Sequence, residues 1–448
     1  MIHSKLENIC VNPNSSMKEV LDKIQKNGKN GVFVTNKNFL LKGMITDADI
    51  RKKILDGTFK NKKFAKDLMQ KKIISIQHKD ASKWDRILIN STKILIPILK
   101  NRKLVDYCHV HDLKGLLKKK ERKQILIIGG LGYIGSILAK NLISKGYYVN
   151  ILDKNLYGNP FIKSKIKNLK IIIGDCFSKK NLSLALAGCS SVVHLGEIVG
   201  DPAVALNTKE AIKNNFEATE FVLNECIKNK IERFIFTSSC SVYGYSNKVC
   251  TEKSKLNPVS LYAKCKIACE EQILSHSSKK ITSTIIRLAT VHGDSLRKRF
   301  DLVVNRFFVF GLQKKKVSLF GENNWRPLVS VNDVAKSIII ILNSPKTKIK
   351  NHIFNVGFSK ENFKIGHIAK KIKKIINFDY SIIPQIEDAR SYKVSFKKIE
   401  NKLKFKPTLT LDQSLKKMKD IYLNKKINLN NINFYNDKKI KFLLNKKD

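Results

Sequence analysis

The segment Gln124–Gly135 reads QILIIGGLGYIG, an apolar run followed by a glycine-rich turn. An apolar strand that ends in such a turn and leads into a helix is typical of a dinucleotide-binding βαβ unit. Gly129 allows the tight turn, and Gly132 lets the backbone approach a pyrophosphate. Gly135 permits close packing of the helix on the strand. The segment therefore predicts a cofactor site at the end of its strand.

Residues around this turn complete the predicted cofactor site. Tyr133 and Ile134 open the helix, where free amides and the positive end of the helix dipole favour phosphate. The next predicted strand ends in Asp153, which can accept hydrogen bonds from both hydroxyls of an adenosine ribose. A carboxylate there repels a 2′-phosphate, so NAD is favoured over NADP, although the neighbouring Lys154 weakens that preference. Asp175 follows the third predicted strand and is either a contact to the adenine amino group or a turn residue.

A second group of residues carries the chemistry. Ser239 lies within the segment Thr237–Gly244 (TSSCSVYG), at the end of a predicted strand, and Tyr262 and Lys266 follow it four residues apart. At that spacing the last two share one face of a helix. We expect the ammonium of Lys266 to lower the pKa of Tyr262 from near 10. Tyr262 then exchanges a proton with a substrate hydroxyl, which Ser239 holds in place. The pattern predicts hydride transfer between NAD and an alcohol or ketone.

Strand and helix patterns alternate after residue 123, which predicts an α/β fold with a doubly wound parallel Rossmann sheet. We expect this domain to span residues 123–448, with a smaller substrate subdomain mainly from about residue 290 onward. A charge run at residues 118–123 (KKKERK) precedes it. We predict strands over residues 125–128, 147–152, 170–173, 191–194, 233–237 and 282–287, and helices over 135–144, 215–228 and 262–274.

Residues 1–118 predict a smaller α+β domain that contains one pattern twice. The segment Gly43–Ile50 (GMITDADI) resembles the CBS-domain family, and the resemblance to a pair of such domains extends over about residues 8–117. The first copy has predicted helices at 17–24 and 48–55 and strands at 31–35 and 40–45. The second has helices at 82–90 and from 112, and strands at 94–99 and 103–110.

The CBS resemblance implies an adenine-nucleotide site in this regulatory domain. It puts forward Thr46 and Asp49 as contacts to the phosphate and ribose of the nucleotide. Capping of the following helix explains the same two residues about equally well. The second copy has Asp106 and His109 where the first has Gly43 and Thr46, so we expect one competent site or none.

Residues 122–410 resemble the extended short-chain dehydrogenase/reductase family, and within it the nucleotide-sugar epimerase/dehydratase group. Ser239 stands four residues before Tyr243, which is the family's spacing for its catalytic Ser or Thr. The resemblance implies that Arg326 and Arg390 face the diphosphate of a nucleotide-sugar substrate, for which a UDP-linked sugar is expected. Other matching segments are Asn215–Thr219 (NFEAT), Arg287–Gly293 (RLATVHG), Trp325–Ala335 (WRPLVSVNDVA), Asn355–Gly357 (NVG) and Arg390–Tyr392 (RSY).

Departures from the family pattern narrow the expected reaction. Family dehydratases and decarboxylases carry an acidic residue directly after the catalytic Ser or Thr, whereas Cys240 and Ser241 follow Ser239 here. Dehydration and decarboxylation are therefore disfavoured, and 4-epimerisation through a 4-keto sugar is the first expectation. Alternatives are a nucleotide-sugar ketoreductase and, in another class, a non-catalytic protein that senses NAD. Glu197 stands where small neutral residues are usual, and it changes the charge of the site if it faces the nicotinamide.

Composition limits the partners. The formal net charge is +49, but the lysines are spread along the chain and no nucleic-acid motif accompanies them, so no specific nucleic-acid partner is expected. The nine cysteines lack metal-binding spacing, which predicts reduced thiols and no metal. No apolar run is long enough to span a membrane, so we expect a cytoplasmic enzyme. The two family resemblances imply a homodimer or a higher oligomer, and a role in cell-surface polysaccharide biosynthesis.

Overall fold

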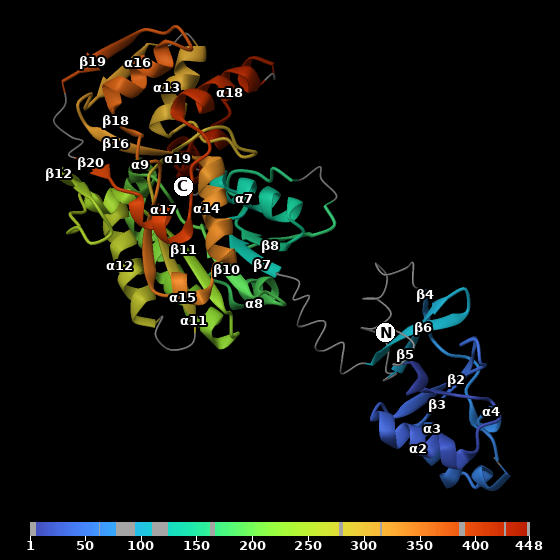
Figure 1. The fold of residues 1–448 in the computed structure, drawn as a ribbon. Helices are drawn as coiled ribbons and strands as arrows, with labels where there is room; N and C mark the ends of the chain where they lie inside the picture. Colours follow the sequence, from blue (N-terminus) through green and yellow to red (C-terminus); the bar gives the residue numbers. More distant parts are fainter. Residues whose placement is uncertain are drawn as a thin grey trace. The chain divides into compact units, whose positions relative to one another are not determined.

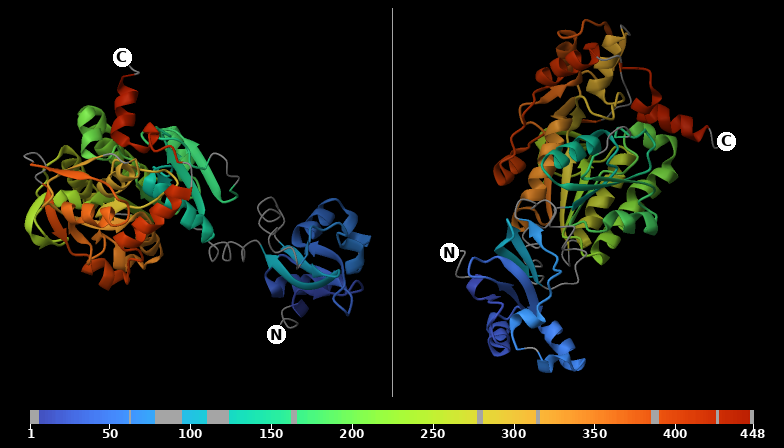
Figure 2. Two further views of the ribbon diagram at one scale, coloured as in Figure 1. Left: turned by 90° about the horizontal axis from the view of Figure 1, so that it is seen from above. Right: turned by 90° about the vertical axis from the view of Figure 1, so that its right-hand side faces the viewer.

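The computed structural model describes residues 6–61, 63–77, 95–109, 124–161, 166–276, 281–313, 316–384, 390–424 and 427–445. It contains two compact units, Met1–Glu121 and Arg122–Asp448 (Figures 1 and 2). The predicted helices at 82–90 and from residue 112, and the whole charge run at 118–123, lie outside the described residues. No helix in the described ranges is long and apolar enough to cross a membrane.

The N-terminal unit contains two small sheets with one strand pattern. In each sheet the first strand runs parallel to the second, and the second pairs antiparallel with the third. The two sheets thus repeat one another, as the sequence predicted for their hairpins. The strands are β1 (Cys10–Val11), β2 (Gly31–Thr35) and β3 (Leu41–Thr46) in one sheet, and β4 (Ile76–Gln77), β5 (Leu95–Lys100) and β6 (Lys103–His109) in the other.

The helices of this unit begin and end at recognisable caps. Helix α2 (Met17–Asn27) starts at a capping box between Ser16 and Glu19. It ends at Gly28, whose φ of 61° is the left-handed conformation that glycine adopts readily. Helix α3 (Asp47–Leu55) follows β3 directly. The short elements η1 (Thr58–Asn61) and α4 (Ala65–Leu68) complete the unit.

The second unit, Arg122–Asp448, is built on a seven-stranded parallel sheet with the order β17-β13-β11-β10-β7-β8-β9. The chain runs outward from β7 through β8 and β9, and then returns to the other side of β7 with β10. The doubly wound fold is confirmed, and ligands bind at such a switch point. The strands are β7 (Gln124–Ile128), β8 (Tyr148–Asp153), β9 (Leu169–Ile173), β10 (Ser191–His194), β11 (Arg233–Ser239), β13 (Thr282–Leu288) and β17 (His352–Val356).

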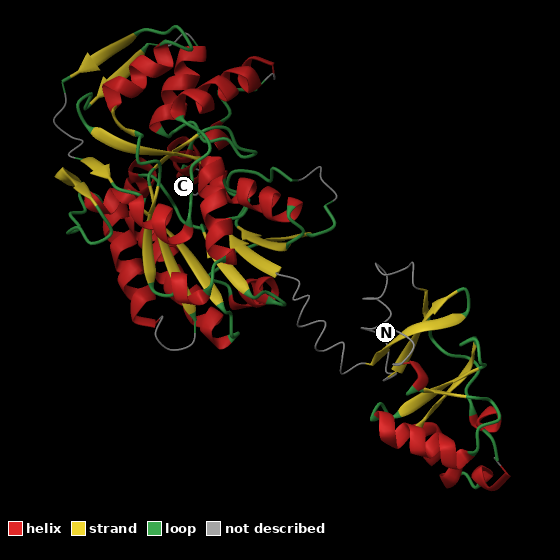
Figure 3. Ribbon diagram, in the orientation of Figure 1, coloured by secondary structure: helices red, strands yellow, loops and turns green. Residues whose placement is uncertain are grey.

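Helices cover both faces of this sheet (Figure 3). α7 (Tyr133–Ser144) and α14 (Val331–Asn343) share one apolar cluster with the sheet. The opposite face packs against α8 (Lys179–Leu186), α11 (Ala218–Lys228) and α12 (Leu261–His276). Because both faces are covered, the central strands are apolar throughout, which explains why the sequence predicts them as uninterrupted runs.

A separate apolar core organises the part after residue 290. Three sheets form around the end of the parallel sheet: β14 (Thr290–His292) with β16 (Trp325–Ser330) and β18 (Asn362–Lys364), β15 (Val317–Phe320) with β19 (Tyr380–Ile383), and β12 (Tyr245–Cys250) with β20 (Ser391–Val394). The longer helices are α13 (Val303–Leu312), α16 (Ile365–Lys373), α18 (Leu411–Asn424) and α19 (Asn436–Leu444). Shorter elements of the unit are α9 (Asp201–Leu206), α10 (Thr208–Ile212), η3 (Lys213–Glu217), η4 (Cys240–Tyr243), α15 (Lys346–Ile349), α17 (Lys397–Leu403) and η5 (Ile432–Phe434).

Candidate active site

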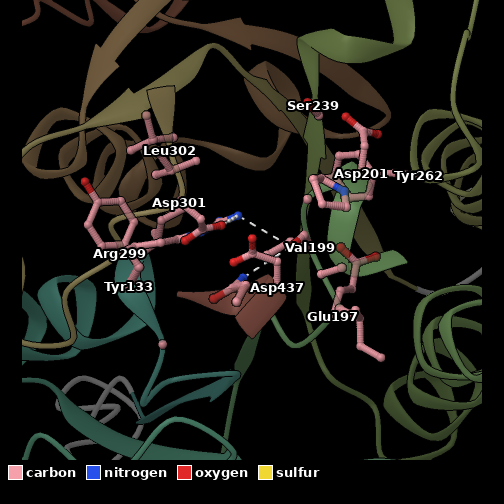
Figure 4. Close-up of a pocket in the computed structure, with 18 of the residues that line it drawn as sticks. Tyr133, Glu197, Val199, Asp201, Ser239, Tyr262, Arg299, Asp301, Leu302 and Asp437 are labelled. Carbon is pink, nitrogen blue, oxygen red and sulfur yellow. Dashed lines mark hydrogen bonds and ion pairs between the residues drawn. The ribbon is translucent and has the colours of Figure 1, made fainter. Parts of the chain in front are cut away.

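A cavity of about 1140 Å³ lies at the carboxyl ends of the parallel strands (Figure 4). Its volume exceeds the 300–1,000 Å³ usual for one small ligand, which leaves room for a dinucleotide and a second ligand. The lining comes from the glycine turn, the ends of β8, β10 and β11, helix α12, the subdomain and α19.

The glycine turn has the shape that a dinucleotide requires. Gly129 has a φ of 78°, and a Cβ there would come within 2.7 Å of the backbone of Gly196. A Cβ on Gly135 would lie 2.4 Å from the carbonyl oxygen of Gly129. Gly132 precedes α7, so the amides of Tyr133 and Ile134 are free for a phosphate. All five residues predicted for the turn line the cavity.

The two predicted adenosine contacts have different surroundings. Asp153 lines the cavity and accepts hydrogen bonds from the amides of Leu131 (3.0 Å) and Asn155 (2.8 Å), while its burial raises its pKa. Asp175 does not line the cavity, and its carboxylate pairs with Lys154 at 2.9 Å. The ion pair favours a local structural role for Asp175, and it also neutralises the lysine beside Asp153.

The three predicted catalytic residues line the same cavity. Ser239 is the last residue of β11, and its hydroxyl oxygen accepts from the amide of Ser241 at 3.1 Å. Tyr262 and Lys266 lie in the first two turns of α12. The ammonium of Lys266 lies 5.6 Å from the centre of the Tyr262 ring and donates to the carbonyl oxygen of Thr237.

The expected lowering of the Tyr262 pKa is wrong for this structure. Burial of the phenol raises its pKa, and the opposing effect of Lys266 is smaller. Lys266 is also not an isolated cation: its ammonium forms an ion pair with Glu197, and both side chains are almost fully buried. Glu197 itself also raises the pKa of Tyr262.

Glu197 is held in the cavity wall by a motif whose role the sequence did not indicate. It follows β10, and one of its oxygens, Oε1, is buried without a hydrogen-bond partner among the described residues. The side chain of Asn215, in the NFEAT motif, forms two hydrogen bonds with the next residue, Ile198. It accepts from the amide of Ile198 and donates to its carbonyl oxygen, at 2.8 Å each. Asn215 belongs to the π-helical turn η3, an element frequent at functional sites. The predicted helix at 215–228 therefore starts as α11 only at Ala218.

Both arginines predicted for the substrate lie in the cavity wall. Arg326 of β16 is 6% exposed and donates to the carbonyl oxygens of Trp325 (2.9 Å) and Arg390. Arg390 pairs with Asp201 at the start of α9. The second oxygen of Asp201 is buried without a hydrogen-bond partner in the described ranges. The wall thus brings a cationic pair and a carboxylate to one side of the cavity.

Three further arginines in the cavity wall, Arg297, Arg299 and Arg306, were not predicted. Arg299 pairs with Asp301 at 3.0 Å and donates to the carbonyl oxygen of Val199 at 3.4 Å (Figure 4). Arg297 lies 4.1 Å from the centre of the Tyr157 ring, and its burial lowers its pKa to about 10. The basic run at 296–301 (LRKRFD) is the signal that could have identified Arg297 and Arg299.

Helix α19 closes part of the cavity. Asn436 donates to the carbonyl oxygen of Val199 at 3.2 Å and accepts from Arg297 at 2.7 Å. The lining residues of this helix are Asn436, Asp437, Ile440, Leu443 and Leu444. No motif spacing indicated this helix, because its position results from packing against residues far away in the sequence.

The two candidate nucleotide contacts of the N-terminal unit cap helix α3. The Thr46 hydroxyl oxygen accepts from the Asp49 amide at 3.2 Å, and the Asp49 carboxylate accepts from the Thr46 amide at 3.0 Å. The second carboxylate oxygen of Asp49 accepts from Gln70. Both side chains therefore have structural partners, and their contact to an adenosyl nucleotide stays a prediction.

Comparison with protein-family models gave two matches. The model of the NAD dependent epimerase/dehydratase family matches residues 125–357. The CBS domain model matches residues 4–56.

Individual proteins resemble the catalytic unit. The chain is 31% identical over 236 residues to an uncharacterized UDP-glucose epimerase, YtcB, of Bacillus subtilis, which covers 50% of this chain and 73% of that protein. It is 27% identical over 316 residues to the UDP-N-acetyl-alpha-D-glucosaminuronate decarboxylase of Bacillus cytotoxicus, covering 66% and 96% of the two chains. The crystal structure of UDP-glucuronic acid 4-epimerase from Bacillus cereus, in complex with UDP-glucuronic acid and NAD, has the same fold. Its TM-score is 0.60 at 24% identity, over 67% of this chain and all of that one.

Proposed function

The chain belongs to the NAD dependent epimerase/dehydratase family, and from that premise we propose that it is an NAD-dependent 4-epimerase of a UDP-linked sugar. Relatives that act on UDP-sugars support the substrate class. The cavity supports it too, because it has room for two ligands and a cationic wall for a diphosphate.

The cofactor would be held mainly by the glycine turn. The free amides at the start of α7 suit its diphosphate, and Asp153 suits the adenosine ribose. Bound NAD supplies the hydride acceptor that the reaction requires. On the opposite wall, Arg326 and Arg390 are the proposed ligands of the substrate diphosphate.

Tyr262 is the proposed acid and base. It takes the proton of the sugar 4-hydroxyl when C4 is oxidised and returns a proton to the oxygen when C4 is reduced. Ser239 donates a hydrogen bond to that oxygen and orients it. The 4-keto sugar must rotate between the two halves so that hydride returns to the other face of C4.

The residues at the end of β11 support epimerisation over dehydration and decarboxylation. Cys240 turns into the core, where its thiol contacts the carbonyl oxygen of Arg287 and is only 1% exposed. Ser241, the next residue, lines the cavity with a neutral hydroxyl. This strand end supplies no carboxylate that could take a carbon-bound proton, which disfavours the dehydratase and decarboxylase reactions of the relatives.

A nucleotide-sugar ketoreductase is the second candidate, and one observation favours it. Burial raises the pKa of Tyr262, which favours the protonated phenol over the phenolate. A protonated phenol is ready to donate to a carbonyl oxygen, as reduction of a keto sugar requires.

The deciding experiment incubates the purified full-length protein with NAD and a panel of UDP-sugars and analyses the products by chromatography and mass spectrometry. A product of unchanged mass and different retention supports the 4-epimerase. A keto sugar that gains two hydrogens at the expense of added NADH identifies the ketoreductase instead. Absence of both activities in the panel contradicts the proposed substrate class.

We also propose that the N-terminal unit regulates the enzyme through an adenine nucleotide. The CBS domain match over residues 4–56 supports this role. Equilibrium dialysis of the full-length protein with ATP and AMP tests it, with Asp49→Ala as the variant expected to lose binding. Lack of binding at millimolar nucleotide contradicts the proposal.

A further inference from the structure

The buried pair of Glu197 and Lys266 lies in the nicotinamide half of the cofactor site. The dinucleotide crosses the switch point of a doubly wound sheet, with its adenosine half on the side of the second strand. Here that side is marked by Asp153 at the end of β8, whereas Glu197 follows β10 on the other side of β7. Glu197, Tyr262 and Lys266 all line the cavity there.

One carboxylate oxygen of Glu197 accepts a hydrogen bond, and the other has no hydrogen-bond partner in the described part of the chain. Its Oε2 accepts from the ammonium of Lys266, with 3% and 2% of the two side chains exposed for Lys266 and Glu197. Its Oε1 is buried and has no partner among the described residues. A buried carboxylate oxygen without a donor costs free energy that a bound hydroxyl would recover. Of the groups on the nicotinamide half, the ribose carries such hydroxyls.

We propose that Glu197 is a positioning residue of the active site: it fixes the ammonium of Lys266 beside Tyr262 and accepts a hydrogen bond from a hydroxyl of the nicotinamide ribose. The inference rests on the proposed NAD-dependent reaction. It gives the cofactor one carboxylate for each ribose, Asp153 on one side and Glu197 on the other.

Burial is the largest cause of the raised pKa of Tyr262, and the charges around the phenol act on the pKa in both directions. Lys266 on its own helix and Arg299 from the 296–301 segment lower the pKa of the phenol, whereas Glu197 and Asp201 raise it. Removing Glu197 leaves Lys266 as an uncompensated neighbour of the phenol, so the phenolate becomes more stable.

Neutral groups pack against the same pair. His194 of β10 is buried, and its pKa falls to about 3, so the ring is neutral. Burial raises the pKa of Cys265 and Cys269, which keeps these thiols of α12 protonated. Glu197 is therefore the carboxylate in direct contact with Lys266 in the described part of the site.

The test uses the full-length protein and the variant Glu197→Gln, which keeps the size of the side chain and removes its charge. The tyrosinate absorbance of each protein is titrated with pH, and the same titration of a Tyr262→Phe background isolates the signal of Tyr262. The dissociation constant of NAD is measured by calorimetry. We expect the pKa of Tyr262 to fall by about one unit and NAD binding to weaken by about ten- to a hundredfold.

Glu225→Gln is the matched control. Glu225 is also buried, pairs with a lysine, Lys228, at 2.8 Å, and does not line the cavity, so its replacement should change neither quantity. If Glu197→Gln does not fold, Glu197→Ala is expected to give both changes. An unchanged pKa of Tyr262, or an unchanged affinity for NAD, overturns the proposal. Neither measurement needs a sugar substrate, so failure of the proposed epimerase activity would leave this test intact.

Discussion

Among single residues, Tyr262 gives the most direct test of the proposed proton transfer. Tyr262→Phe removes the exchangeable proton and keeps the ring, so we expect kcat to fall by about 10²–10⁴-fold with the affinity for NAD little changed. Steady-state kinetics and calorimetry check this. Tyr245→Phe is the control, because Tyr245 is 52% exposed and does not line the cavity. Full turnover by the Tyr262 variant would exclude this residue as the acid and base.

Asp153 is expected to set the choice of cofactor. Asp153→Ser removes the charge that repels a 2′-phosphate, so NAD binding should weaken by about tenfold and the preference over NADP should shrink. Dissociation constants of both dinucleotides provide the measurement. Asp175→Ser tests the neighbouring carboxylate, which does not line the cavity, and should leave the affinity for NAD within about twofold. A larger loss from Asp175→Ser would restore the adenine contact as its role.

Glu361 makes stability depend on pH. Burial raises the pKa of its carboxyl group to about 7 from the ordinary 4.5. The folded state therefore binds this proton more tightly than the unfolded state, so the stabilisation is complete below about pH 4.5 and is lost as pH rises through 7. Glu361→Gln stays neutral and can still accept from the amide of Leu411, the 2.6 Å contact in the wild type.

The variant should raise the free energy of unfolding above pH 7 by on the order of 2 kcal/mol and have little effect near pH 4.5. Thermal and denaturant unfolding at both pH values measure the difference. The exposed Glu271→Gln serves as control. Equal effects of Glu361→Gln at both pH values would contradict the assignment.

The sequence predicted the location of the candidate catalytic residues better than it predicted their pKa values. Ser239, Tyr262 and Lys266 line one cavity, and the sequence could group them because their spacing along one strand end and one helix is local. The pKa of Tyr262 was predicted in the wrong direction, mainly because the sequence did not show that the phenol is buried, and also because Glu197, which pairs with Lys266, lies 69 residues away in the sequence. A pairing of that kind depends on how β10 and α12 meet, which no local pattern contains.

Among the elements, α19 gives the sharpest prediction. Asn436→Ala removes two hydrogen bonds that tie this helix to Val199 and Arg297. At about 1 kcal/mol each, their loss should increase the rate of NAD release by about fivefold or more. Stopped-flow fluorescence of NADH release measures it. Asn445→Ala, at the exposed end of the helix, should leave the rate unchanged. Equal release rates for both variants would show that the helix does not retain the cofactor.

Elements were predictable where their signal is periodic. Six of the seven strands of the parallel sheet and α7 were predicted to within two residues, since apolar runs and a glycine turn define them locally, whereas β17 was not predicted. The position of α19 was not predicted, because Asn436 and Arg297 are 139 residues apart. Its sequence indicates a helix but not the surface on which it packs.

For the whole molecule, the division into two units makes a prediction. The fragment 122–448 contains every residue of the cavity and forms one compact unit. Expressed alone, it should keep kcat within about threefold of the full-length value and lose any response of its activity to ATP or AMP. Assays of both proteins with and without nucleotide check this. A fragment that still responds to nucleotide would place the regulatory site in the catalytic unit.

The wall that α19 adds to the cavity offers a route to altered substrate scope. Five of its side chains face the ligand space, and none of them belongs to the residues proposed to move a proton or hold a phosphate. A combinatorial library at the four positions other than Asn436, which ties the helix to Val199 and Arg297, would therefore widen or narrow the accepted sugars while the hydride-transfer machinery stays constant.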